Sequence, residues 1–162
     1  MGIPTRKSLE HLHCSVANTA ELIGDRWTVL ILRDAFLGVR RFDDFQKDLG
    51  IARNVLTDRL AMLVEAGIFS PRLYEDRPPR FEYRLTEKGR DLYDLLVTMW
   101  RWGDKWSPPE ERFLRNLIHI DCGTVTHAVI RCEGCGGDLD TRNTRVEPPL
   151  ALVEQRRARA AT

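Results

Sequence analysis

The chain has 162 residues, 43% of them hydrophobic and 30% charged, a composition typical of a globular protein with one main domain and an appendage. No apolar stretch approaches the ~20 residues that span a bilayer, and no export signal precedes the first helix, so we expect a cytoplasmic protein without a membrane partner. The net charge of only +1 gives no support for nucleic-acid binding, so the case for such binding has to rest on where the basic residues lie.

Three short helices are predicted in the first fifty residues. Residues 15–23 place apolar side chains at helical intervals, and Gly24 interrupts the pattern. Residues 27–36 are apolar around most of the circumference, which is typical of a central core helix. Residues 42–48 form the third, with acidic residues in the first turn, where they suit the helix dipole, and Gly50 after it.

Residues 51–66 predict a helix with two different faces. Leu56, Leu60 and Leu63 recur at i, i+4 and i+7, so we expect them to face the core. The opposite side has groups that can hydrogen-bond to base edges or phosphates, namely Arg53, Asn54, Thr57 and Arg59. Two helices separated by a short break, the second with such a face, make a helix-turn-helix.

A β-hairpin is predicted to follow. Residues 68–74 have strand character, residues 75–80 form a turn-rich tip, and residues 81–85 alternate apolar and polar. Two prolines stiffen the tip and are expected to hold Arg77 and Arg80 outward, where they reach a phosphate or a minor groove. A hairpin in this position is a wing.

Thr86 is predicted to cap a last long helix that ends at Pro108. Its apolar residues are Leu92, Leu95, Leu96, Met99, Trp100, Trp102 and Trp106. This surface exceeds what one small domain needs to cover itself, which favours packing on a second subunit in a homodimer. The alternative is a helix folded back on its own core.

Four segments of the chain form a recognisable set: Cys14 ahead of residues 21–34 (ELIGDRWTVLILRD), Arg41-Phe42, residues 55–60 (VLTDRL) and residues 77–89 (RPPRFEYRLTEKG). Together they resemble the HxlR family of bacterial winged-helix regulators over residues 14–106. The resemblance implies a mainly α fold with a small β-hairpin, the MarR-like winged helix-turn-helix, dimerising through its first and last helices. It also implies a transcriptional regulator, most simply a repressor, with the helix from Arg53 in a major groove of an operator and the wing near the DNA backbone.

The same resemblance adds Arg41 and Ala52 to the expected DNA-binding residues. Ala52 stands where the family commonly has a serine that caps the recognition helix, so this helix lacks a side-chain acceptor worth typically ~1 kcal/mol. Asn54 stands where a lysine or arginine is common, which removes a charge but supplies a group able to pair bidentately with adenine. The operator is therefore expected to differ from those of relatives.

Cys14 has two interpretations. Some family members respond to electrophiles or oxidants through a cysteine in this position, and the positive end of the following helix favours a reactive thiolate, so Cys14 is a candidate redox sensor. Cysteine is also among the most readily buried residue types, so a packing role is the alternative. The resemblance leaves room for a small-molecule or oxidant effector.

The tail contains His119-x-x-Cys122-Gly and Cys132-x-x-Cys135-Gly. Paired ligands two residues apart, each followed by glycine, are typical of a small structural zinc site, with residues 123–131 expected as a hairpin joining the two turns. The alternatives are free thiols, a Cys132–Cys135 redox pair, or His127 as the fourth ligand. A structural zinc ion is thus the candidate cofactor, and no organic cofactor is expected.

The expected organisation is a winged helix-turn-helix and dimerisation domain at 1–107, a cysteine-containing tail at 108–147 and a flexible end at 148–162. A sequence-specific regulator of double-stranded DNA is the leading function. A winged helix that binds only protein is the second, because the charge is nearly neutral. A thiol or zinc enzyme is third and disfavoured, since no HExxH, GxSxG or phosphate-binding glycine loop is present.

Overall fold

The computed structural model of the protein describes residues 9, 12, 14–108, 110 and 116–147. The chain divides into two compact units, Met1–Arg115 and Asn116–Thr162. The predicted flexible end at 148–162 lies outside the described residues. No helix in the described ranges is long and apolar enough to cross a membrane.

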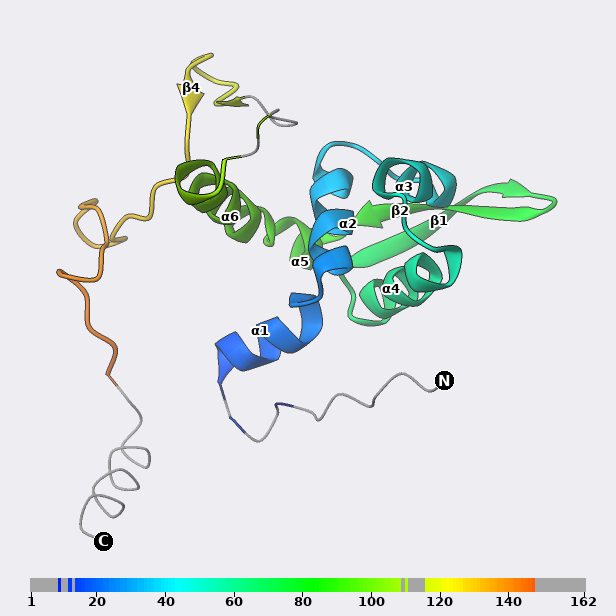
Figure 1. Ribbon diagram of the computed structural model, residues 1–162, viewed down its shortest axis with the longest axis horizontal. Coiled ribbons are helices and arrows are strands. Elements are labelled where there is room, and N and C mark those ends of the chain that lie inside the picture. Colours follow the sequence, from blue (N-terminus) through cyan, green and yellow to red (C-terminus); the bar gives the residue numbers. More distant parts are fainter. Residues whose placement is uncertain (1–8, 10–11, 13, 109, 111–115, 148–162) are drawn as a thin grey trace, which may run out of the picture. The chain divides into compact units, whose positions relative to one another are not determined.

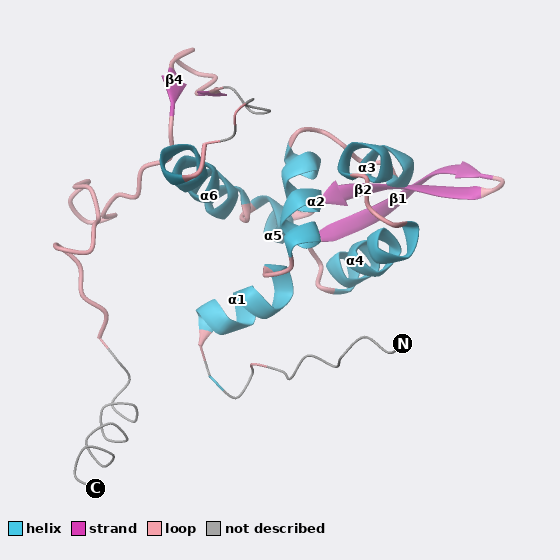
Figure 2. Ribbon diagram, viewed as in Figure 1, coloured by secondary structure: helices cyan, strands magenta, loops and turns pink. Residues whose placement is uncertain are grey.

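The first unit consists of helices with one β-hairpin (Figures 1 and 2). Its elements in chain order are α1 (Ser15–Ile23), α2 (Arg26–Phe36), α3 (Phe42–Leu49), α4 (Arg53–Glu65), β1 (Phe69–Asp76), β2 (Pro79–Leu85), α5 (Glu87–Arg90) and α6 (Tyr93–Trp106). The predicted mainly α class with a small hairpin is confirmed, and α1 has the predicted bounds.

The core lies where α2, α3 and α4 meet the start of the hairpin. Leu56, Leu60 and Leu63 are buried, which confirms the predicted inner face of α4. They pack in one cluster with Ile31 of α2 and Phe45 of α3, and fully burying side chains of this kind stabilises the fold by roughly 1.5–3 kcal/mol each. The position of α4 is therefore set by its apolar face.

Asp25 ties the start of α2 to α4. Its carboxylate accepts hydrogen bonds from the backbone N–H groups of Trp27 and Thr28, which caps α2. The same carboxylate lies 3.2 Å from Nε of Arg59 on α4. One acidic residue thus closes a helix end and holds a second helix against it.

The hairpin β1–β2 is antiparallel and extends away from the helices (Figure 1). Its strands run to Asp76 and from Pro79, so the turn is much tighter than the predicted tip at 75–80. A register shift between Leu73 and Glu75 sets Tyr74 in a bulge. Residues before α3 also join the hairpin, because the N–H of Tyr83 donates to the carbonyl of Arg40 at 2.7 Å.

The predicted last helix is interrupted. Thr86 caps α5 by accepting a hydrogen bond from the N–H of Gly89, as expected, but α5 ends at Arg90 and α6 begins at Tyr93. Gly89 is pressed against the chain after α4, where an added Cβ would stand 2.3 Å from the carbonyl oxygen of Ile68. This close approach anchors α5 at the base of the hairpin, and the turn after it lets α6 take a separate course.

The second unit contains two short hairpin-like turns. Strands β3 (Leu117–Ile118) and β4 (Val125–Thr126) pair antiparallel, and an isolated bridge joins Arg131 to Asp138. The prediction of a single hairpin over residues 123–131 was wrong, because the chain reverses at residues 119–123 and again at 132–136. Glycines in the left-handed region, Gly123 and Gly136, close both reversals.

Candidate functional site

The outer face of α4 is polar and accessible. Arg53, Asn54 and Thr57 are exposed in the first turns of α4, whereas Leu56, Leu60 and Leu63 are buried. The hydroxyl of Thr57 donates to the carbonyl of Arg53 at 2.9 Å, which leaves its lone pairs facing solvent. These side chains can therefore meet an external ligand without rearrangement of the helix.

The first turn of α4 has no side-chain cap. Ala52 has the extended backbone of an N-cap, with φ −63° and ψ 138°, and its carbonyl accepts the first helical hydrogen bond from Leu56. The missing acceptor leaves N–H groups of this turn open to solvent or to a bound anion. A phosphate placed here would supply what the side chain lacks.

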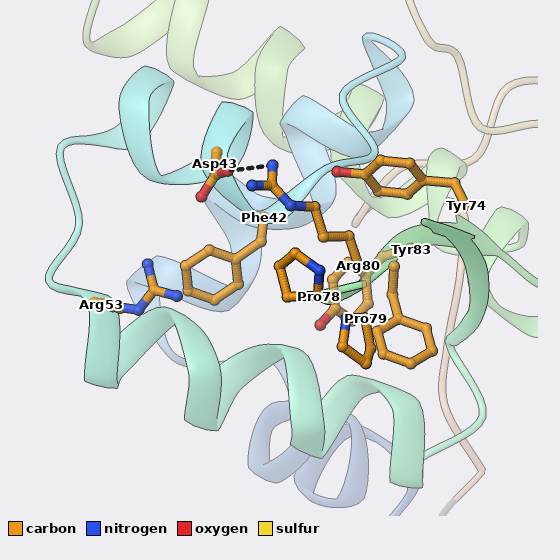
Figure 3. A pocket seen from close by; sticks show the side chains of 9 residues that line it. Phe42, Asp43, Arg53, Tyr74, Pro78, Pro79, Arg80 and Tyr83 are labelled. Carbon is orange, nitrogen blue, oxygen red and sulfur yellow. Dashed lines mark ion pairs between the residues drawn. The ribbon is translucent and has the colours of Figure 1, made fainter. Parts of the chain in front are cut away.

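A cavity of about 440 Å³ lies between the start of α4, α3 and the hairpin (Figure 3). Its lining residues are Phe42, Asp43, Arg53, Tyr74, Pro78, Pro79, Arg80, Phe81 and Tyr83. The guanidinium carbon of Arg53 stands 4.9 Å from the centre of the Phe42 ring. This cation–π contact orients Arg53 along the edge of the cavity and keeps its donors available.

The basic residues of the wing differ in their surroundings. Arg77 is exposed at the turn. Arg80 is paired instead, at 3.9 Å from Asp43 (Figure 3) and at 3.4 Å from Glu75. A hydrogen bond with Tyr74 together with these charges raises the pKa of the guanidinium. The structure thus differs from the expected outward pair, because acidic groups on α3 and β1 hold Arg80 at the cavity.

Arg41 lies at the base of the wing. Its guanidinium carbon is 4.5 Å from the centre of the Tyr74 ring, and its Nε is 3.5 Å from Glu82. A hydrogen bond from Arg84 to Glu82, helped by the charge of Arg41, lowers the pKa of that carboxyl. Arg41 remains half exposed and can reach a phosphate beside the wing.

Arg59 was predicted to bind DNA, but in the structure it contacts Asp25 at the start of α2. Its side chain is half-buried and its Nε faces the carboxylate of Asp25 at 3.2 Å. Six positions after Arg53, the helix has rotated this residue away from the exposed turn and toward the start of α2. Arg59 therefore holds α4 to α2 and is not one of the groups that face outward.

The seven apolar residues of the predicted last helix fall into three groups. Leu92 and Leu96 pack against the chain's own core, in line with the alternative interpretation for that side of the helix. Trp100 is half-buried, and its indole N–H donates to Asp104 at 3.1 Å. The third group, Leu95, Met99, Trp102 and Trp106, is exposed, and the structure adds Tyr93 of α6 and Val16 of α1.

Cys14 immediately precedes α1 as its N-cap residue and is exposed. The alternative interpretation of Cys14 as a buried residue with a packing role does not agree with this exposure. The thiol makes no side-chain capping bond, so it is accessible to a reagent in the surrounding solvent.

In the second unit, the structure forms two local pairs. Nδ1 of His119 lies 3.3 Å from the sulfur of Cys122, and Cys132 is hydrogen-bonded to Cys135. Hydrogen bonds from Thr124 lower the pKa of Cys122, and hydrogen bonds from backbone N–H groups of Cys135 and Gly134 lower that of Cys132. The pairs stay apart: among the described residues, no three potential ligands are grouped closely enough to hold a metal ion.

Some residues at this site had no sequence signal. Tyr74 owes its place to the bulge, and Phe42, named only as part of the family resemblance, was not expected to contact Arg53. Arg40 pairs with β2 through a segment too short to show alternation. Asp25 could have been found, since an aspartate before a helical run is a typical N-cap.

The helices, the break between α3 and α4, and the hairpin after them define a winged helix-turn-helix protein. Residues 22–111 match the family described as HxlR-like helix-turn-helix, and the chain belongs to this family. It is an HTH-type transcriptional regulator with DNA as its partner.

Known proteins with this fold are similar over most of their lengths. The HTH-type transcriptional regulator Rv3095 of Mycobacterium tuberculosis is 46% identical over 134 residues, 83% of this chain and 85% of that protein. The crystal structure of PA1607 superposes with a TM-score of 0.73 at 39% identity, covering 84% and 95% of the two chains. The redox regulator HypR in its reduced form has a TM-score of 0.53 at 32% identity over 57% and 92%. The relatives are transcriptional regulators, not enzymes.

Proposed function

We propose that the protein is a homodimeric, sequence-specific operator-binding repressor of the cytoplasm. Each α4 enters a major groove, with the two helices about one turn of DNA, ~34 Å, apart. Arg53, Asn54 and Thr57 read or flank base edges, while Arg41 and Arg77 contact the backbone beside the wing. The uncapped start of α4 at Ala52 meets a phosphate.

The observation that carries this proposal is the division of α4 into two faces. Three leucines fasten one face into the core, so the polar groups on the other are presented by a rigid element. Asn54 offers a donor and an acceptor for the N6/N7 edge of adenine, and Arg53 offers a planar fork for guanine. The arginines at the start of α4 and beside the wing support DNA binding although the net charge of the chain is only +1.

The homodimer is supported by the apolar residues that α1 and α6 leave uncovered. Trp102 and Trp106 are 63% and 64% exposed, and Val16 is 77% exposed. Tryptophan is enriched where subunits meet, because it buries a large apolar area on association. A C₂ dimer through these helices would also present two copies of α4 to one operator.

Oxidant sensing through Cys14 is the regulatory part of the proposal. The thiol is exposed at the first turn of α1, close in sequence to the surface assigned to the dimer. Oxidation there would change the contacts of α1 and so the spacing of the two recognition helices. HypR, a redox regulator of similar fold, supports this assignment.

The proposal is tested by titrating the full chain with DNA from its own promoter at two salt concentrations. We expect affinity to fall steeply with salt, because arginine contacts release counterions. Arg53→Ala and Asn54→Ala should each lose about 1–3 kcal/mol of binding to the operator, with discrimination relaxed at one base pair.

Arg59→Met is the matched control, since it removes the same kind of charge from the same helix at a position held by Asp25. It should change the DNA affinity far less than Arg53→Ala. No salt-dependent binding would contradict the proposal and favour a protein-binding winged helix. Mild oxidation should release wild-type protein but not Cys14→Ser, and equal sensitivity of both would remove Cys14 from the mechanism.

A further inference from the structure

The two turns of the second unit have the same backbone geometry. In the first, the N–H of Gly123 donates to the carbonyl of His119 at 2.8 Å, and in the second the N–H of Gly136 donates to Cys132 at 2.8 Å. Both glycines are left-handed, with φ of +68° and +71°. Each turn therefore holds its first and fourth residues, His119 and Cys122 or Cys132 and Cys135, on the same side.

The first turn already has the separation that one metal ion requires. Zinc binds nitrogen at about 2.0–2.1 Å and sulfur at about 2.3 Å, so two such ligands of a tetrahedral ion stand roughly 3.5 Å apart. Nδ1 of His119 and Sγ of Cys122 are 3.3 Å apart. An ion can bind this pair with little movement of either side chain.

The environment of the imidazole fits the same role. With Nδ1 turned to the sulfur, Nε2 is on the far side of the ring, 3.6 Å from the carboxylate of Asp121. A histidine that binds metal through one nitrogen usually directs the other N–H to a carboxylate or carbonyl, which fixes the tautomer. Asp121 is placed to do this for His119.

Each turn also closes a paired segment. β3 and β4 flank the first turn. The second is flanked by the bridge between Arg131 and Asp138 and by a 2.8 Å hydrogen bond from the N–H of Cys132 to the carbonyl of Gly137. Two hairpins, each with a ligand pair at its reversal, are the arrangement typical of a zinc ribbon.

The unit has little apolar burial of its own. Ile118, Ile120, Val125, Ile130 and Leu139 are all exposed, and Ile120 is 91% exposed. A segment of this size without a core needs another source of folding free energy, and a structural metal is the usual one.

We propose that His119, Cys122, Cys132 and Cys135 hold one structural zinc ion that joins the two hairpins. The ion would bring together the two ligand pairs, which are separate in the structure as described. Apolar side chains of the two hairpins would then cover one another. Four protein ligands leave no position for a substrate water, so the site stabilises the unit and performs no catalysis.

The test uses the full chain purified without a histidine tag, with zinc measured by mass spectrometry of the metal. We expect about one zinc per chain in the wild type and a loss of most of it in Cys122→Ser and in Cys135→Ser. Cys14→Ser and His127→Ala are matched controls outside both turns and should keep the metal. Titration of metal-depleted protein with Co²⁺ should produce the visible absorption of a tetrahedral thiolate site.

Folding of the variants is checked by circular dichroism, because the helices lie in the first unit and contain none of the four ligands. Less than about half a zinc per chain in the wild type would overturn the proposal, as would Co²⁺ without tetrahedral absorption. Zinc retained after either cysteine is replaced would do the same. Loss of zinc in His127→Ala but not in His119→Ala would refute the assignment of His119.

Discussion

Ala52→Ser should stabilise the protein by giving α4 the cap that it lacks. The backbone of Ala52 is already extended, with φ −63° and ψ 138°, and the side chain is exposed. A serine can therefore be accommodated without a shift of the chain, and its oxygen can accept from the N–H of Val55 in the first turn. No existing hydrogen bond has to break.

The magnitude follows from the number of groups satisfied. One capped N–H is worth about 1 kcal/mol, within a range of roughly 0.5–2 kcal/mol. For a unit of this size, 1 kcal/mol raises the Tm by about 4–8 °C. Thermal and urea unfolding without DNA, at one fixed protein concentration, measure the change, since association would otherwise shift the apparent stability. Hydrogen exchange of the Val55 amide should slow in parallel.

Ala61→Ser is the matched control, because it makes the same chemical change at an exposed position inside α4. Serine is a poorer helix former than alanine, so this variant should lose about 0.5 kcal/mol. The two substitutions must have opposite signs. If Ala52→Ser left the stability unchanged or lowered it, α4 would not begin where the structure has it.

Three further outcomes are expected. Asp25→Ala should cost about 1–2 kcal/mol in urea unfolding, because it removes both the cap of α2 and the ion pair with Arg59, whereas Arg59→Met removes only the pair; equal costs would contradict the double role. Glu82 has a lowered pKa in the folded state, so its charge stabilises the fold above the unfolded pKa of about 4.5 and loses that effect as the pH falls through the folded pKa; Glu82→Gln should therefore destabilise at pH 7 and cease to do so in acid. Trp102→Glu should convert the proposed dimer to monomer in light scattering, and an unchanged mass would place the interface elsewhere.

The two faces of α4 were predictable because they depend on a local period. Leu56, Leu60 and Leu63 recur at helical intervals, and any helix with this pattern turns them to one side. Asn54 and Thr57 then point away from the leucines, whereas Arg53, seven positions before Leu60, lies beside them and is exposed in the first turn of the helix. The hairpin was predictable for a similar reason, through alternation and turn residues.

Only the tertiary structure decided the contacts between segments that are distant along the chain. Arg59 was assigned to the outer face, yet the start of α2 brings Asp25 to it. Arg80 was expected to point outward, but the bulge at Tyr74 and the first turn of α3 surround it with acidic groups. Side-chain periodicity predicts the direction of each side chain around its own helix or strand. It does not predict which charged group of another element lies in that direction.

The tail shows the same division. Its ligand spacing and glycines were sufficient to predict two tight turns, because a left-handed residue after a short loop reverses the chain locally. The location of β3 and β4 around the first turn was not predictable, since strands of only two residues leave no periodic pattern. Sequence alone thus determined the apolar face of α4 and the two glycine turns of the tail, and packing between elements decided which of its charged groups remain open to a partner.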